Sequence, residues 1–206
     1  MSIVKLNNQA VKNATSFGSI SSLGSMVFIK KLTASSSATL SFVDGSDGVV
    51  LDNSYKEYCF TFNNIHPQND AVKFQFNLST DGGSTYAVTK TTTFFRARHR
   101  EDDVVTSLDY KTANDLAQST SDQVLDDGLG NDNDQALSGS LTLFNPSSDT
   151  FVKHFISDIN EIQDNDMSLR GFVAGYGNTV NPIDAIRFQM SSGNIDAGDI
   201  CLYGIA

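Results

Sequence analysis

The sequence predicts an all-β protein, an antiparallel β-sandwich preceded by an extended N-terminal arm. Only three of its 24 acidic residues are Glu, and Asp favours turns over helix interiors. The 14 Phe and six Tyr residues supply most of the large apolar side chains, and Trp is absent. Short stretches of alternating apolar and polar residues recur between clusters of Gly, Pro, Asn and Asp, which is typical of strands joined by turns.

The chain of 206 residues is short enough for one sandwich domain, which we assign to residues 26–206. Residues 1–25 are predicted to form the arm, joined to the domain by a Gly/Ser-rich run. Ile3, Val4 and Leu6 are candidate interface residues, because an extended apolar segment can add a strand to the exposed edge of a neighbour. The alternative, an arm that packs on its own domain, stays open.

The predicted strands follow the alternating stretches in order, with turn residues between them. About eight to ten short strands result, a number and spacing that suit a sandwich or a jelly roll. The eleven candidate stretches from which these strands come are residues 25–32, 38–43, 57–65, 71–79, 85–100, 104–112, 138–146, 150–159, 169–177, 185–192 and 199–205.

The clearest strand lies within residues 71–79, where every second side chain is apolar and is predicted to face the core. These side chains are Val72, Phe74, Phe76 and Leu78. The turn Asp81-Gly82-Gly83 follows. Because glycine adopts positive φ readily, we predict that the strand and the next extended segment form a hairpin.

Two segments depart from this alternation. Residues 112–125 lack a full apolar stripe and are predicted to be a loop. Residues 199–205 are apolar at both alternating sets of positions, so this strand is predicted to be covered on both sides. The core covers one side, and either another part of the chain or a neighbouring subunit covers the other.

The charge of the chain argues against two classes of partner. The formal net charge is −10, whereas nucleic acid and anionic membrane surfaces require a clustered positive face. The N-terminal region shows neither a signal peptide nor a transmembrane span. We therefore expect synthesis in a cytoplasm, no nucleic-acid partner and no membrane insertion, and we interpret the acidic surface as an aid to solubility.

Two cysteines, Cys59 and Cys201, lie in predicted strands. Thiols in a chain made in a reducing compartment are usually buried apolar side chains rather than disulfide partners. We therefore expect both to be free.

The loop at residues 126–139 is the candidate for a calcium site. Asp126, Asp127, Asp132 and Asp134 offer the hard oxygen ligands that calcium prefers. Counted from Asp132, the EF-hand pattern lacks both its glycine and its final carboxylate. Loops rich in Asn and Asp also arise as Asx turns, so we expect no cofactor and keep calcium as the alternative.

Arg96, Arg98 and Arg100 share one face of a predicted strand. Like charges in line on a strand are unfavourable unless they are paired. Acidic residues 101–103 or a cross-strand acid are the partners expected within the domain. An acidic neighbouring subunit is the alternative, which makes the three arginines candidate interface residues.

The sequence contains none of the common catalytic motifs, namely a nucleophile elbow, a phosphate loop, a zinc-protease helix or a dinucleotide fingerprint. A glycosidase pair could be hidden among the many aspartates, but no Trp is present to stack on sugars. We therefore predict a protein that is not an enzyme and has no catalytic residues.

Several strings of the sequence are distinctive, namely "GNDND" at 130–134, "LFNPSS" at 143–148, "GYGNT" at 175–179 and "SSGNIDAG" at 191–198, followed by "LYGI". On these strings the chain resembles virion structural proteins of tailed, podovirus-like and often marine bacteriophages, over nearly its whole length. The resemblance implies a jelly-roll structural protein that is assembled in the host cytoplasm into the virion. It also implies other virion proteins as partners and a homo-oligomer, expected to be a trimer.

We therefore predict a non-enzymatic protein at the surface of the virion, associated with the tail or fibre and contributing to host attachment or virion assembly. In that role, loops 126–139 and 177–182 would contact host surface polysaccharide. A capsid decoration protein that stabilises the shell is the first alternative. A carbohydrate-binding module or a polysaccharide-degrading enzyme is the second.

Overall fold

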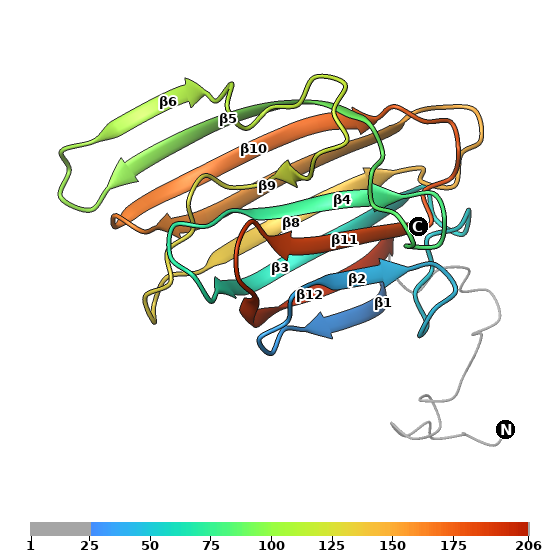
Figure 1. Cartoon of the computed structure of the whole chain (residues 1–206), viewed down its shortest axis with the longest axis horizontal. Helices are drawn as coiled ribbons and strands as arrows, with labels where there is room; N and C mark the ends of the chain where they lie inside the picture. The colour runs from blue at the N-terminus through green and yellow to red at the C-terminus, as the bar shows by residue number, and fades with distance from the viewer. Residues whose placement is uncertain (1–25, 206) are drawn as a thin grey trace, which may run out of the picture.

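A computed structural model describes residues 26–205, which form two packed antiparallel sheets (Figure 1). The predicted β-sandwich is confirmed, whereas the arm, with Ile3, Val4 and Leu6, lies outside the described residues. None of the described residues belongs to a helix of the length and apolarity that crossing a membrane requires. The strands are β1 (Met26–Thr33), β2 (Leu40–Val43), β3 (Glu57–Pro67), β4 (Phe74–Ser79), β5 (Lys90–Arg100), β6 (Thr106–Tyr110), β7 (Gln123–Val124), β8 (Leu137–Phe144), β9 (Lys153–Gln163), β10 (Met167–Gly177), β11 (Ala185–Met190) and β12 (Ile195–Ile205).

The described residues thus contain twelve strands, more than the eight to ten expected from the sequence. Eight of them pair in a nested order, β1 with β12, β2 with β11, β3 with β8 and β4 with β7. These pairs form the order β1-β12-β3-β8 in the large sheet and the whole of the small sheet, β2-β11-β4-β7. The other four strands continue the large sheet beyond β8 as β9-β10-β5-β6, here called the extension.

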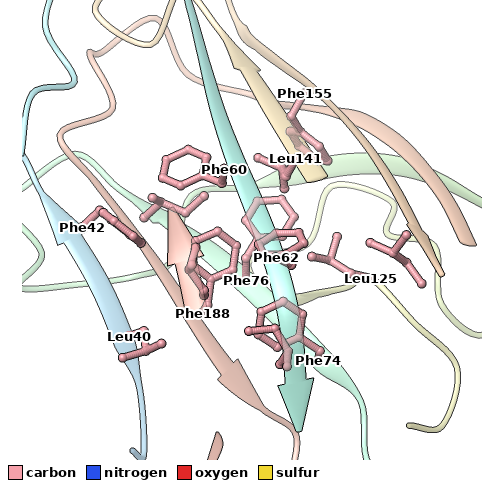
Figure 2. Packing of buried hydrophobic residues seen from close by; sticks show 14 of the residues in the cluster. Leu40, Phe42, Phe60, Phe62, Phe74, Phe76, Leu125, Leu141, Phe155 and Phe188 are labelled. Atoms are coloured by element: carbon pink, nitrogen blue, oxygen red, sulfur yellow. The ribbon is translucent and has the colours of Figure 1, made fainter. Parts of the chain in front are cut away.

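The core between the sheets is built largely from phenylalanine, and Phe188 on β11 lies at its centre (Figure 2). The Phe188 ring stacks on Phe74 with the centroids 5.7 Å apart. It also lies near the rings of Phe42, Phe60, Phe62 and Phe76. These side chains come from both sheets, so the core aromatics hold the two layers together.

The predicted alternation of β4 is confirmed, because Val72, Phe74, Phe76 and Leu78 are all buried. The predicted hairpin of β4 with β5 is wrong. The glycines of the turn do adopt positive φ, but β4 pairs with β11 and β7 while β5 pairs with β10 and β6 in the other sheet. The buried side chain of Val88 lies in the core where the chain crosses between the layers, so this connection joins two sheets instead of closing a hairpin.

Residues 111–136, here called the covering loop, lie across the inner face of the extension. Leu125 and Leu129 are fully buried there, and the Gly130 amide donates to the carbonyl of Ile162 on β9 (3.2 Å). A Cβ at Gly171 on β10 would lie 2.9 Å from the Leu125 carbonyl oxygen, so this close approach requires glycine. Residues 112–125 are a loop, as predicted, apart from the two-residue strand β7.

The C-terminal strand β12 lies between β1 and β3 in the large sheet. Its inner side chains Ile200 and Leu202 are in the core, as predicted. On the outer side Cys201 is buried, whereas Tyr203 and Ile205 are only half-buried, so the expected second cover is partial among the described residues. Both Cys59 and Cys201 are free thiols.

We expect Phe188→Ala to lower the free energy of unfolding by about 3 to 5 kcal/mol, because it leaves a cavity where both sheets meet. Denaturant unfolding of the two proteins measures the loss. Phe151→Ala is the control, since Phe151 is 69% exposed and its change should stay within about 0.5 kcal/mol. A loss for Phe188→Ala as small as that of the control would contradict the central role of this ring.

Candidate functional site

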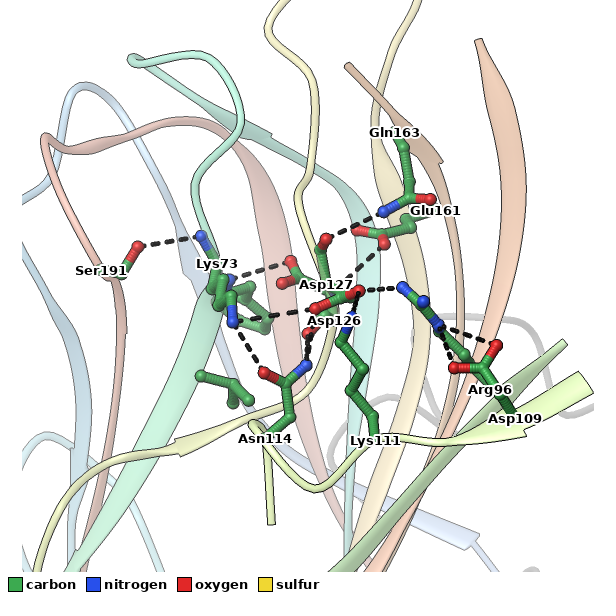
Figure 3. Close-up of polar contacts among 12 residues, drawn as sticks. Lys73, Arg96, Asp109, Lys111, Asn114, Asp126, Asp127, Glu161, Gln163 and Ser191 are labelled. Atoms are coloured by element: carbon green, nitrogen blue, oxygen red, sulfur yellow. Dashed lines mark hydrogen bonds and ion pairs between the residues drawn. The ribbon is translucent and has the colours of Figure 1, made fainter. Parts of the chain in front are cut away.

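A cluster of charged side chains lies beneath the covering loop, between the two layers (Figure 3). The loop contributes Asp126 and Asp127, and β9 contributes Glu161. Arg96 on β5 and Lys73, just before β4, approach from the two sheets. The sequence places these residues far apart, and the inner face of the extension brings them together.

Asp126 and Glu161 form a buried carboxyl pair. They are 0% and 1% exposed, and each carboxyl affects the pKa of the other. Asp126 Oδ2 accepts from the Phe74 amide (2.9 Å) and Glu161 Oε1 from the Asp127 amide (3.2 Å). No donor group within residues 26–205 reaches Asp126 Oδ1 or Glu161 Oε2. A proton on one carboxyl supplies the missing donor.

The surroundings favour the protonated form of this pair. Burial raises the pKa of Asp126 to about 7, against the opposing effect of the Phe74 and Gly128 amides and Lys73. Burial, followed by the charge of Asp126, raises the pKa of Glu161 well above its ordinary value, and Arg96 opposes this. The two carboxyls therefore titrate as a coupled pair, and both pKa values are shifted upward, toward the protonated form.

Asp127 provides the ionic contacts of the cluster. It pairs with Arg96 through Arg96 Nη1, with Lys111 (3.3 Å) and with Lys73 (3.7 Å). Arg96 is 4% exposed and also pairs with Asp109 on β6 (3.2 Å). The four carboxyl groups of the cluster thus outnumber its three cations, and the proton on the buried pair balances the charge. Because Asp126 and Glu161 are enclosed, the pair holds the covering loop but does not reach a substrate.

The candidate calcium ligands are divided by the fold. Asp126 and Asp127 belong to the cluster, while Asp132 and Asp134 are exposed further along the loop. Within residues 26–205, no three His, Cys, Asp or Glu side chains are placed to share a metal ion.

The three arginines of β5 find partners within the domain. Arg96 is buried in the cluster, Arg98 donates to Ser107 Oγ (2.8 Å) and Arg100 pairs with Asp102 (2.7 Å). The predicted pairing is therefore confirmed for Arg96, whose partner Asp109 is a cross-strand acid, and for Arg100, whose partner Asp102 is an adjacent acid. Arg96 contributes little surface to any interface.

The outer face of the large sheet carries a row of side chains without charge. The row crosses seven of the eight strands through directly opposed residues, from Phe28 on β1 to Thr93 on β5. Its members are Phe28, Tyr203, Cys59, Thr142, Ile156, Ala174 and Thr93. A sheet face that met only water would be expected to carry charged or strongly polar residues at such positions.

An aromatic patch extends this row over β9, β10, β5 and β6. Phe95 and Phe172 stack with centroids 4.7 Å apart, and the Arg170 guanidinium lies 4.6 Å from the Phe172 ring centre. The exposed fractions are 42% for Phe95, 56% for Ile156 and 74% for Leu108. We define the aromatic patch as Phe95, Leu108, Tyr110, Ile156 and Phe172.

A groove of about 480 Å³ lies beside the patch. His154, Tyr176 and Phe144 line it, and the hydroxyl-bearing residues Thr91 and Thr93 lie along the same groove. Its walls therefore combine aromatic rings with a few polar groups.

Loops 126–139 and 177–182 do not combine into one binding surface. Leu129 pairs with Gln163 at the end of β9, whereas Gly177 pairs with Lys153 at its start. An eleven-residue strand separates them by roughly 30 Å.

Glu161, Lys73, Lys111 and the aromatic patch are not among the residues predicted from the sequence. Alternation within β5 and β10 does place Phe95 and Phe172 opposite the core side, which was an available signal. No local pattern identifies Glu161, because its partner Asp126 comes from a segment read as loop.

Comparisons with known proteins gave no match, whether to a protein family, a curated protein or a solved structure. The charged cluster and the outer face of the large sheet are therefore the two features on which a function can be based.

We expect Asp126→Asn to become more stable relative to the wild type as the pH rises from about 4 to about 7. A buried acid with a raised pKa binds more protons in the folded state than in the unfolded state, so the free energy of unfolding of the wild type falls as the pH rises through this interval. The Asn side chain has an N–H donor in place of the carboxyl proton and does not titrate. Unfolding measured from pH 4 to 8 should show a relative change on the order of 3 kcal/mol.

Asp158→Asn is the control for this measurement. Its pair with Arg170 lowers the pKa of Asp158, so its contribution is present above pH 4 and lost in acid. The variant should therefore lose relative stability as the pH rises from acid through 4. A flat difference for Asp126→Asn from pH 4 to 7 would exclude the protonated pair.

Proposed function

We propose that the chain is a non-enzymatic structural subunit of a bacteriophage virion that associates with copies of itself through the aromatic patch. The observation that carries this proposal is the uncharged row on the outer face of the large sheet together with the exposed aromatic patch that extends it. Exposed, contiguous apolar surface of this kind marks sites of protein association, and aromatic residues are enriched at such interfaces. The resemblance of the sequence to virion proteins of tailed phages supports the same role.

We also propose that the sandwich is a jelly roll with two insertions. The pairing of β1 with β12, β2 with β11, β3 with β8 and β4 with β7 is the order produced when one long hairpin is rolled into two sheets. The segments β5–β6 and β9–β10 are the insertions, and they build the extension that carries the aromatic patch. If copies associate through the extension, the surface of the rest of the sandwich stays free for other contacts.

Within the virion we place the protein at the tail or fibre, where it contributes to host attachment or assembly. Electron microscopy of particles labelled with an antibody against this chain tests that placement. Label on the tail supports it, and label on the capsid assigns the decoration role instead. Particles without label would overturn the assignment to the virion.

Glycan binding is a second candidate function, favoured by the groove at His154 and Tyr176. Aromatic rings beside hydroxyl groups can stack on a sugar ring and accept its hydrogen bonds. We expect Tyr176→Ala to weaken binding to host surface polysaccharide at least tenfold in calorimetry, with Tyr55→Phe as a control away from the groove. Equal binding by both variants would remove this candidate.

We expect Ile156→Asp combined with Leu108→Asp to raise the dissociation constant for self-association at least tenfold, because both changes place charge in an apolar interface. Sedimentation velocity measures the oligomer over a concentration series. Phe151→Asp is the control, since the exposure of Phe151 (69%) lies between those of Ile156 and Leu108 and Phe151 is not part of the patch. A wild-type protein that stays monomeric at all concentrations would contradict self-association through the patch.

A further inference from the structure

Two lysines are fully buried where β5 and β9 begin. Lys90 and Lys153 are both 0% exposed, and they pair with Gly177 on β10 from its two sides. Neither lysine has an ion pair within residues 26–205. A buried ammonium without a carboxylate is unfavourable, so the groups around each nitrogen decide what that lysine can do.

Lys153 has the surroundings of a structural lysine. Its Nζ donates to the carbonyl oxygens of Phe151 (2.7 Å), Thr179 (3.4 Å) and Val180 (3.3 Å). These three acceptors match the three N–H groups of an ammonium, and all of them belong to the backbone. Lys153 therefore holds two loops together as a cation.

Lys90 differs from Lys153 because one of its acceptors is a side-chain amide. Its Nζ donates to Asn77 Oδ1 (2.5 Å) and to the Val88 carbonyl oxygen (2.8 Å). Asn77 is 2% exposed, so water is kept from this contact. Because a C=O bond is about 1.2 Å long, Asn77 Cγ lies at most about 3.7 Å from the lysine nitrogen. This separation is close to that of two atoms about to react.

Other contacts hold both partners in place. Asn77 Oδ1 also accepts from the Leu78 amide (2.9 Å), and Asn77 Nδ2 donates to the Thr120 carbonyl (3.0 Å). Ser119 exchanges two backbone hydrogen bonds with Lys90 (2.8 and 3.0 Å). The covering loop thus fixes the lysine and the amide together. The Leu78 amide is placed to stabilise negative charge on Oδ1 during attack on Cγ, as a donor of an oxyanion hole does.

Burial also makes Lys90 a better nucleophile. It lowers the pKa of Lys90 to about 8, against the opposing effect of the Asp122 charge. Only the neutral amine has the lone pair with which nitrogen attacks a carbonyl carbon. A substantial share of Lys90 therefore has this lone pair in weakly alkaline solution.

We propose that Lys90 and Asn77 form an amide bond with each other, a covalent cross-link between β5 in the large sheet and β4 in the small sheet (Figure 1). Lys90 Nζ attacks Asn77 Cγ, a C–N bond forms, and the bond from Cγ to Nδ2 breaks. Two of the three protons of the lysine ammonium, one lost before the attack and one during it, end on the departing nitrogen. That nitrogen leaves as an ammonium ion, so the reaction needs no oxidant and no co-reactant.

The cross-link removes a buried charge and closes a ring where the chain crosses between the sheets. The ring contains residues 77–90, with the turn Asp81-Gly82-Gly83 inside it. Such a bond restrains the unfolded chain as a disulfide does. The inference concerns the chain itself and does not depend on the role proposed for it in the virion.

A second pair of the same groups provides a comparison within the chain. Lys73 Nζ donates to Asn114 Oδ1 (2.7 Å). The Lys73 side chain is 34% exposed, however, and it pairs with Asp127 (3.7 Å). An ammonium that is paired with a carboxylate and open to water keeps its charge. We therefore expect no cross-link between Lys73 and Asn114.

Mass spectrometry of the full chain, incubated folded in weakly alkaline buffer, tests the proposal. We expect the intact mass to be lower than the mass calculated from its sequence by one ammonia. Trypsin does not cleave after an acylated lysine, so residues 74–96 should be recovered as one peptide that lacks one ammonia. Cleavage of this peptide before Asp81 should leave its two halves joined. A folded chain that keeps its full calculated mass would overturn the proposal.

Two variants separate this bond from the other reaction that releases ammonia at Asn77, attack by the Leu78 backbone nitrogen to give a cyclic imide. Lys90→Met keeps the apolar stem, removes the amine and should restore the full calculated mass. Lys153→Met is the matched control, because it changes an equally buried lysine, and it should still lose ammonia. Loss of ammonia that persists in Lys90→Met identifies the imide and overturns the proposal. If Lys90→Met does not fold, cleavage of the wild-type peptide before Asp81 decides, because an imide lets the halves separate.

Discussion

The structure depends on keeping water from the inner face of a sheet that is twice as wide as its partner. Eight strands face four, and the phenylalanines around Phe188 fill only the part where the two sheets overlap. Over the extension the chain places the covering loop instead, with Leu125 and Leu129 buried against β9 and β10. A loop lacks the regular hydrogen bonds with which a sheet pairs its backbone N–H and C=O groups. Its contact with the extension is therefore partly polar. The charged cluster is the consequence.

The architecture was predictable wherever one strand face is apolar and the other polar. The alternation of Val72, Phe74, Phe76 and Leu78 identified β4 because its period matches the pleat of a strand. The same reasoning could not decide which strands pair, since a turn such as Asp81-Gly82-Gly83 fits either a hairpin or a crossing between sheets. β7 was missed because a strand of two residues has no period.

The candidate site was less predictable than the fold. Asp126 and Asp127 are adjacent in sequence and read alike as possible calcium ligands, yet one enters a buried carboxyl pair and the other pairs with three cations. That division depends on Glu161 and Arg96, which lie some 30 residues away on either side. Charge and burial are properties of the assembled layers, so no local pattern could separate the two aspartates.

The extension also constrains the order in which its parts can have been acquired. The β9–β10 segment pairs with β8 of the nested set and needs no other added strand. Among the described strands, the β5–β6 segment pairs only with β10 and with itself. An ancestor with the first segment alone would have had a complete, though shorter, sheet, whereas one with the second alone would have lacked β10, the strand with which β5 pairs. The same dependence applies within each molecule, where the outer segment has a partner strand in the sheet only while β10 is in place.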